Sequence, residues 1–313
     1  MAFRAVENLH QQGAAMRKRS VAVVGLGNLG RRCAEALSTD PFLALVGVVR
    51  RSDQPPVAWL KAPVVEHIRE LGVVDVALLC VPPDVVPGAA RELLQARIPV
   101  VECARLHGEA FVEHKAEMDR VAHLYGVAAV VGAGWDPGLF SVFRSQFALL
   151  VPHGHTQSSL HTGASLHHTL AAQGIAGVRQ ALATELKTLD NTGQRYVYVE
   201  LEPGTDVAAV ERAIRQDPTY LDEQTYVFPV DSIAALEQQN RGVLLERHSA
   251  RGHADHTSLL LEARFDEARL AAQIMLAAAR ALPWLRAGAY SLLDVAPGLL
   301  WGAQSLATEK QWI

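Results

Sequence analysis

Five short, strongly apolar segments recur along the first half of the chain, and the apolar residues between them have helix-like spacing. After the first segment, for example, Cys33, Ala36 and Leu37 are spaced as on one face of a helix. Strands that are apolar throughout and alternate with helices are typical of a parallel sheet covered on both faces. We therefore predict an α/β domain with a doubly wound parallel sheet (a Rossmann domain) and strands at 21–25, 43–49, 73–81, 98–103 and 126–134.

The pattern changes after about residue 150. Several segments there alternate apolar and polar residues, as half-buried strands do, and two helices are expected among them. Asp206 is placed to cap the first helix, and the second runs from Asp266 to a stop at Pro283. This mixture predicts an open α+β sheet with strands at 158–163, 195–201, 224–230, 242–249 and 256–265.

These patterns divide the chain into a polar leader (1–19), a dinucleotide-binding domain (20–150) and a second, α+β domain (151–284). No linker rich in Gly or Ser separates the two domains. The boundary near 140–155 is therefore placed by the change of pattern alone.

Composition narrows the class of protein. With 313 residues, half of them hydrophobic, the chain can bury at least one full core, and a net charge of -4 argues against a nucleic-acid binder. No apolar run approaches the ~18 residues that a membrane span needs. The three cysteines have no paired or metal-type spacing. We therefore expect a cytoplasmic protein with reduced thiols that binds neither nucleic acid nor membranes.

A glycine-rich motif lies between the first predicted strand and the helix that follows it. Gly25 permits a tight turn, Gly27 lets the backbone approach a pyrophosphate, and Gly30 lets helix and strand pack closely. Asn28 and Leu29 begin the helix, whose free N–H groups would bind phosphate. The motif predicts a dinucleotide site; the alternative is a glycine-rich turn without a ligand.

The end of the second predicted strand decides which dinucleotide binds. An NAD site usually has Asp or Glu there to bind the ribose 2′-hydroxyl, whereas this chain has Arg50 and Arg51. Guanidinium groups suit a 2′-phosphate, so we predict NADP(H) as the cofactor, with a solvated arginine loop as the alternative. Val81 and Pro82, after the third strand, would form a wall beside the nicotinamide ribose.

Residues 134–138, Gly-Trp-Asp-Pro-Gly, resemble a segment of the meso-diaminopimelate D-dehydrogenases, NADP-dependent enzymes that oxidatively deaminate the D-centre of a diamino diacid. The resemblance extends over most of the chain and includes the cofactor motif, GASLHHTLAAQGIAGV (163–178) and AYSLLDVAP (289–297). It implies a homodimer in which the second domain serves substrate binding and dimerisation. It also implies that residues 285–313 return to the first domain.

The resemblance further implies roles for individual residues. Trp135 and Asp136 would line the reactive end of the substrate, where Asp136 accepts a hydrogen bond from the amino group. An Asx turn before Pro137 is a second role open to Asp136. Arg195 would bind the distal carboxylate through two parallel hydrogen bonds. The other expected substrate-binding residues are Glu102, Arg105, Ser165, His168, Arg241 and His256.

Several of these positions depart from the family pattern. Arg105 stands where the family has a carboxylate that contacts the reacting amine, Arg241 stands at its pocket histidine, and His256 lies near its asparagine. The cofactor residues match the family better than the substrate residues do. We therefore expect an amino acid or amine other than meso-diaminopimelate, or a broader range of substrates, with meso-diaminopimelate itself a poor one.

The expected activity is NADP-linked oxidative deamination, or the reverse reductive amination. Two alternatives stay open: an NADPH-dependent imine or keto reductase, and a nucleotide-binding sensor with a decayed substrate site. We expect no metal, because hydride transfer to a nicotinamide needs none to activate the substrate. The pairs His153/His155 and His253/His256 are then loop or pocket histidines.

Overall fold

The computed structural model describes residues 17–51, 58–161, 166–187, 193–221, 224–249 and 257–302. The chain forms two compact units, the first from Met1–Gln146 with Ala268–Ile313 and the second from Phe147–Glu267. Most of the expected leader (1–16) and the end of the expected returning segment (303–313) lie outside the described residues.

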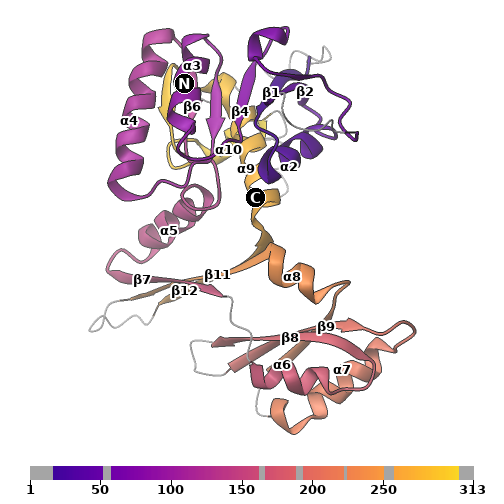
Figure 1. Ribbon diagram of the computed structural model, residues 1–313. Coiled ribbons are helices and arrows are strands. Elements are labelled where there is room, and N and C mark those ends of the chain that lie inside the picture. The colour runs from indigo at the N-terminus through magenta and orange to yellow at the C-terminus, as the bar shows by residue number, and fades with distance from the viewer. Residues whose placement is uncertain are drawn as a thin grey trace. The chain divides into compact units, whose positions relative to one another are not determined.

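A seven-stranded sheet with strand order β13-β6-β5-β4-β1-β2-β3, parallel throughout, is the framework of the first unit (Figure 1). The strand order reverses between β1 and β4, as in doubly wound folds, which confirms the predicted fold class. Carboxyl ends of all strands therefore lie at one edge, where ligands bind in such sheets. The strands are β1 (Arg19–Val24), β2 (Leu43–Val49), β3 (Val64–Val65), β4 (Val76–Leu79), β5 (Val100–Glu102), β6 (Ala128–Val130) and β13 (Gly288–Tyr290).

Helices cover both faces of this sheet. Cys33 of α2 and Met275 of α9 are fully buried on one face with β-strand residues such as Val23. Leu94 of α3 and Met118 of α4 are buried on the other face. The bounds are α2 (Asn28–Leu37), α3 (Val86–Gln95), α4 (Gly108–Tyr125), α5 (Leu139–Leu150), α9 (Glu267–Ala281) and α10 (Pro297–Leu300).

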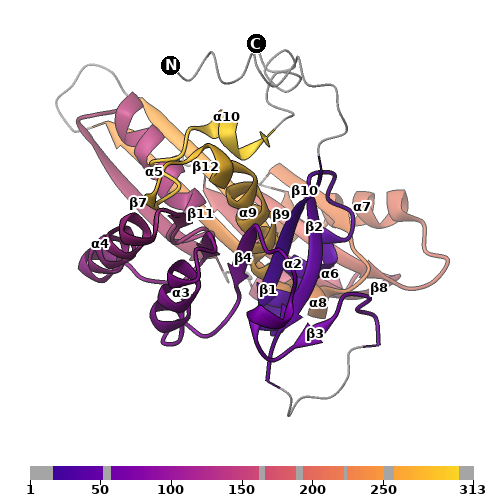
Figure 2. The same cartoon turned by 90° about the horizontal axis from the view of Figure 1, so that it is seen from above.

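Helix α9 begins the return of the chain to the first unit (Figure 2). Its expected place was the second domain, with a return near residue 285, but the return starts at Ala268. Its apolar face packs into the core of the parallel sheet, and Arg280 donates to Asp40 at 2.6 Å. Burial of that face and this ion pair explain why the helix belongs with the sheet.

The described residues of the second unit form two three-stranded sheets, with orders β10-β9-β8 and β12-β11-β7. The prediction of a single open sheet was therefore wrong, because the alternating pattern does not show which strands pair. The bounds are β7 (Gly154–His161), β8 (Val178–Lys187), β9 (Gly193–Leu201), β10 (Gln224–Pro229), β11 (Asn240–Ser249), β12 (Ser258–Asp266), α6 (Leu166–Gln173), α7 (Val207–Gln216) and α8 (Ile233–Gln239).

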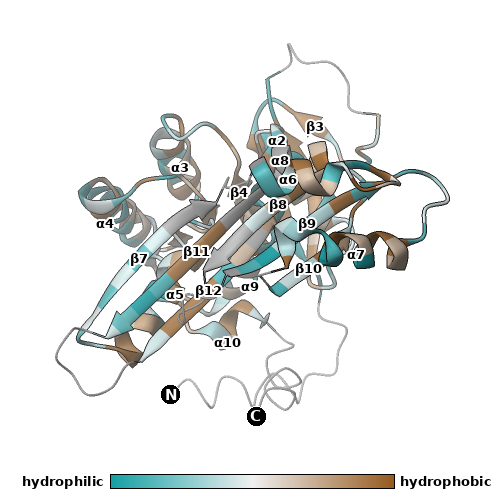
Figure 3. Ribbon diagram, turned by 90° about the horizontal axis from the view of Figure 1, so that it is seen from below, coloured by the Kyte–Doolittle hydropathy of each residue, from teal (hydrophilic) through white to brown (hydrophobic). Residues whose placement is uncertain are grey.

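The sheet β10-β9-β8 packs its buried face against α6 and α7. Val197 and Val199 are fully buried with Ile214 of α7. Figure 3 shows hydrophobic and hydrophilic residues side by side along α7, which is the pattern of a helix half-buried on a sheet. The Asp206 carboxylate accepts from the Ala208 N–H at 3.0 Å, so the predicted helix cap is confirmed.

Candidate active site

The glycine-rich loop joins β1 to α2 at the carboxyl edge of the parallel sheet. Gly25 has φ +92°, a conformation that favours glycine. A Cβ atom on Gly30 would run into the carbonyl oxygen of Gly25, so this position excludes every larger residue. The two glycines therefore make the turn possible and bring α2 close to β1.

Gly27 has a different environment. A Cβ on Gly27 would meet no atom of the protein within 4 Å, so the fold itself does not require glycine there. Gly27 and Asn28 are exposed, and helix α2 starts with no side-chain cap and no acidic residue in its first turn. The open space and the uncapped N–H groups of residues 28–30 fit the pyrophosphate of a dinucleotide.

Arg50 and Arg51 directly follow β2 and lie next to this loop. The Gly25 N–H donates to the carbonyl of Val49 at 2.8 Å, and the Arg50 N–H donates to the carbonyl of Val65 at 2.9 Å. Arg50 is half-buried and Arg51 is exposed. The hydrogen bond from Gly25 to the end of β2 thus places the backbone of Arg50 and Arg51 beside the loop that would hold the pyrophosphate.

Val81 and Pro82 follow β4, the strand on the other side of β1. The Cys80 N–H donates to the carbonyl of Val24 at 2.8 Å, which fixes this segment beside the glycine-rich loop. Val81 lies against Gly25, and Pro82 is exposed. Both residues therefore lie beside the glycine-rich loop, and their role as a wall of the nicotinamide site stays a prediction.

Asp136 lies on the loop between β6 and α5. Its carboxylate is partly exposed and forms an ion pair with Arg144 of α5, with 3.1 Å between Oδ1 and Nη1. The imidazole of His107, before α4, lies 4.0 Å from the same oxygen. Trp135 is only 8% exposed and stacks on Phe140, with 5.1 Å between ring centroids. The buried indole anchors the loop and leaves Asp136 accessible.

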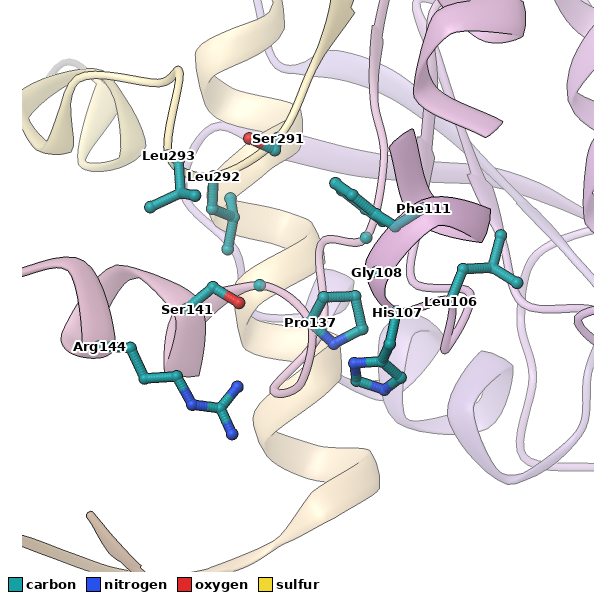
Figure 4. Close-up of a pocket in the computed structure, with 12 residues that line it drawn as sticks. Leu106, His107, Gly108, Phe111, Pro137, Ser141, Arg144, Ser291, Leu292 and Leu293 are labelled. Carbon is teal, nitrogen blue, oxygen red and sulfur yellow. The ribbon is translucent and has the colours of Figure 1, made fainter. Parts of the chain in front are cut away.

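A cavity of about 240 Å³ lies beside this loop (Figure 4). Figure 4 shows Arg144 and His107 reaching toward Pro137 from α5 and from the start of α4. Both side chains also approach Asp136, so the cavity is next to the candidate catalytic carboxylate. The rest of its lining includes Leu106, Phe111, Ser141, Ser291, Leu292 and Leu293.

Glu102, the last residue of β5, is not placed to contact a substrate, which corrects the expectation from the sequence. Its side chain is 1% exposed. The carboxylate accepts from the Gly132 N–H at 3.0 Å, from the Ala104 N–H, and from Nε2 of buried His114 at 3.1 Å. These donors occupy both carboxylate oxygens from inside the unit. Glu102 therefore binds the backbone of Ala104 and Gly132 and does not face a substrate. Arg105, on the loop after β5, is exposed.

Three thiols lie near the strand ends. Cys33 and Cys80 have their sulfur atoms 3.7 Å apart. The contact with Cys33, together with burial, raises the pKa of the Cys80 thiol well above its usual value, and burial raises the pKa of Cys103 to about 12. Burial therefore opposes formation of the thiolate at Cys80 and Cys103, which disfavours either thiol as a nucleophile.

The remaining candidate residues belong to the second unit. Arg195, on β9, is 1% exposed and lies opposite Thr225 of β10 in the sheet register. His168, on α6, packs its ring 5.3 Å from that of Tyr220, whose hydroxyl donates to the carbonyl of His168. Arg241 pairs with Phe265 in the β11–β12 ladder. Ser165 and His256 lie outside the described residues.

The described residues contain neither a cluster of metal ligands nor a membrane-spanning helix. No three His, Cys, Asp or Glu side chains among them gather as ligands of a metal ion would. None of the helices in the described residues of either unit is both long and apolar enough to cross a membrane. The cytoplasmic location stays a prediction.

No family model matches the chain. A meso-diaminopimelate D-dehydrogenase from Bacteroides fragilis is 34% identical over 282 residues, which are 90% of this chain and 94% of that enzyme. The chain belongs to the meso-diaminopimelate D-dehydrogenase family. The resemblance that began with residues 134–138 is thereby confirmed.

Two solved structures extend this relationship. A C. glutamicum DAP dehydrogenase in complex with DAP has a TM-score of 0.61 at 25% identity, over 91% of this chain and 96% of that one. An engineered D-amino acid dehydrogenase bound to NADP+ has a TM-score of 0.60 at 25% identity, over 90% and 96% of the two chains.

In this member of the meso-diaminopimelate D-dehydrogenase family, three residues that the sequence analysis did not select contact the candidate site residues. Arg144 and His107 contact Asp136, and His114 contacts Glu102. Arg144 lies eight positions after Asp136, on a helix that was not predicted over 139–150. Helical spacing after Asp-Pro-Gly was the signal that could have placed Arg144 on the same side as Asp136.

Proposed function

We propose that the protein is an NADP(H)-dependent amino-acid dehydrogenase that catalyses oxidative deamination of an amino acid or amine, or the reverse reaction. The observation that carries this proposal is Asp136, an accessible carboxylate paired with Arg144 beside a cavity. It lies in the same unit as the glycine-rich loop. Family membership and the NADP+ bound to an engineered relative support the cofactor and the reaction class.

Asp136 has a defined task in this reaction. Its carboxylate accepts a hydrogen bond from the substrate amino group and so orients the carbon that loses hydride. Arg144 holds the carboxylate in place. The nicotinamide, when bound, supplies the hydride acceptor. Loss of hydride from carbon and of a proton from nitrogen to water turns the substrate into an imine, and water then converts the imine to a carbonyl compound and ammonia.

A turnover panel tests the proposal directly. Amino acids of both configurations and simple amines are offered with NADP+, and the matching keto acids with NADPH and ammonia. We expect steady change in nicotinamide absorbance with at least one substrate. Asp136→Asn should lower kcat/KM by about 100-fold or more. Glu117→Gln, which alters a half-buried carboxylate paired with Arg120 on α4, should change it little. Cofactor binding without turnover across the panel would contradict the proposal and favour a sensor.

The same panel, repeated with NAD+, tests the choice of cofactor. Arg50 and Arg51 stand beside the glycine-rich loop and would bind a 2′-phosphate that NAD+ lacks. The double substitution Arg50→Ala and Arg51→Ala should therefore weaken NADP+ binding at least tenfold and leave NAD+ binding nearly unchanged. Equal affinity of the unaltered protein for both cofactors would refute this assignment. The homodimer that the resemblance implies stays a prediction, which sedimentation would test.

A further inference from the structure

Glu102 and His114 form a buried, hydrogen-bonded pair near the carboxyl edge of the parallel sheet, which we call the reacting edge. Their side chains are 1% and 5% exposed, and 3.1 Å separates Oε1 of Glu102 from Nε2 of His114. A carboxylate removed from water is stable only when hydrogen bonds saturate its oxygens. The donors that do so here are His114 of α4 and backbone N–H groups from two different loops.

The two carboxylate oxygens of Glu102 bind two different loops. Oε2 accepts from the N–H of Ala104, directly before Arg105. Oε1 accepts from the N–H of Gly132, at the start of the loop that carries Asp136. The backbone carbonyl of Glu102 also accepts from the N–H of Ala133, at 2.7 Å. A single residue thus ties together the segments that bear Arg105 and Asp136.

We propose that Glu102, oriented by His114, is a positioning residue that fixes the separation of Arg105 and Asp136 and thereby the pose of the reacting amine. This inference rests on the proposed dehydrogenase activity. Two acceptor oxygens and no donor are needed to bind two converging N–H groups, a requirement that a carboxylate meets and an amide does not. His114 donates to Oε1 and holds the carboxylate in the orientation that spans both loops.

Glu102→Gln is the decisive variant. It keeps the size of the side chain but turns one oxygen into an NH₂ group, which then faces the N–H of Ala104 or Gly132. The loop that loses its acceptor shifts, and a displacement of about 1 Å can lower turnover by about 100-fold. We expect a 10- to 100-fold fall in kcat for the best substrate, with the Kd for NADP+ changed less than twofold.

Asp40→Asn is a matched control for loss of stability. Asp40 is also a buried carboxylate of the first unit, and it accepts from the N–H groups of Phe42 and Leu43 and from Arg280. It precedes β2, so it lies at the amino edge of the sheet, opposite the reacting edge. Asp40→Asn should lower the melting temperature as Glu102→Gln does, without lowering kcat. An equal loss of kcat in both variants, or an unchanged kcat in Glu102→Gln, would overturn the proposal.

His114 supplies a rescue test. His114→Gln retains a side-chain N–H that can donate to Glu102, whereas His114→Ala does not. We expect kcat to stay within about threefold of the unaltered protein in His114→Gln and to fall at least tenfold in His114→Ala. Equal kcat in these two variants would mean that donation to Glu102 is not the role of His114.

Hydrogen exchange separates this inference from the proposed activity. In Glu102→Gln, backbone amides in 104–107 and 132–136 should exchange faster, while those preceding β2 keep their protection. If the unaltered protein turns over no amino acid, the proposed function fails, and the exchange pattern still decides whether Glu102 holds the two loops. Unchanged exchange in both segments would overturn the positioning role whatever the activity.

Discussion

Arg105 places a cation on the loop after β5, where the resemblance to the family implies a carboxylate. It is exposed on the loop after β5, next to Ala104, whose N–H is held by Glu102. A guanidinium ~4 Å from a substrate ammonium would repel it by about 4 kcal/mol at an effective dielectric constant of about 20. Solvent reduces that figure, but a quarter of it still lowers affinity several-fold.

We predict that meso-diaminopimelate is a poor substrate and that Arg105→Asp raises kcat/KM for this substrate. The ratio of kcat/KM for meso-diaminopimelate to kcat/KM for the best substrate in the panel should rise at least fivefold in this variant, because a cation is replaced by an anion at the reacting edge. Arg286→Asp makes the same change of net charge at an exposed position before β13 and should leave the ratio unchanged. Efficient turnover of meso-diaminopimelate by the unaltered protein would disprove the prediction.

Glu102 shows what a sequence alone cannot determine at this scale. A carboxylate after a buried strand is expected at the ligand-binding edge, and the backbone of Glu102 is there. Whether its side chain turns to the substrate or to the interior depends on donors far away in the sequence, Gly132 and His114. Gly25, Gly27 and Gly30 differ in this respect, because their spacing and their flanking strand and helix were all local signals.

At the scale of elements, a buried ion pair adds to the burial of the apolar face that holds α9 on the parallel sheet. The side chains of Arg280 and Asp40 are 19% and 2% exposed and 2.6 Å apart. Arg280→Ala should lower the free energy of unfolding of the first unit by about 3 kcal/mol, because it leaves a carboxylate buried without its cation. Urea titration followed by circular dichroism measures this change.

Arg120 is the control for that measurement. Its ion pair with Glu117 on α4 is also within hydrogen-bond distance, at 3.0 Å, but the Arg120 side chain is 65% exposed. Arg120→Ala should therefore cost less than about 1 kcal/mol. If the two substitutions cost the same, the Arg280–Asp40 pair does not hold α9 on the sheet.

The elements that sequence reasoning predicted are those with a local signal. Five strands of the parallel sheet lie on the apolar runs that predicted them, and α7 begins at a side-chain cap. Strands β3 and β13 are two and three residues long and carry too few positions for a pattern. Strand β8, VRQALATELK, mixes polar and apolar residues because it pairs with one neighbour at an edge of its sheet. The division of the second unit into two sheets depends on pairing, which no local pattern encodes.

On the scale of the whole molecule, the chain contains two units with separate buried cores. In the first, residues of α2 and α9 meet the parallel sheet, and in the second, residues of α7 meet β9. The first unit is discontinuous in sequence, because Ala268–Ile313 completes it after the second unit. It also contains the whole glycine-rich loop, so a bound dinucleotide would stabilise this unit through its own contacts.

We predict that thermal unfolding proceeds in two calorimetric transitions and that NADP+ raises only one of them. At a concentration 100 times its Kd, a ligand that binds only the folded first unit stabilises it by about 2.7 kcal/mol. Arg280→Ala should lower the transition that NADP+ raises, because Arg280 is in the first unit. Ile214→Ala removes a fully buried side chain of α7 and should lower only the other transition, by a loss of about 2–5 kcal/mol. A single transition that both substitutions lower equally would show that the two cores unfold as one cooperative unit.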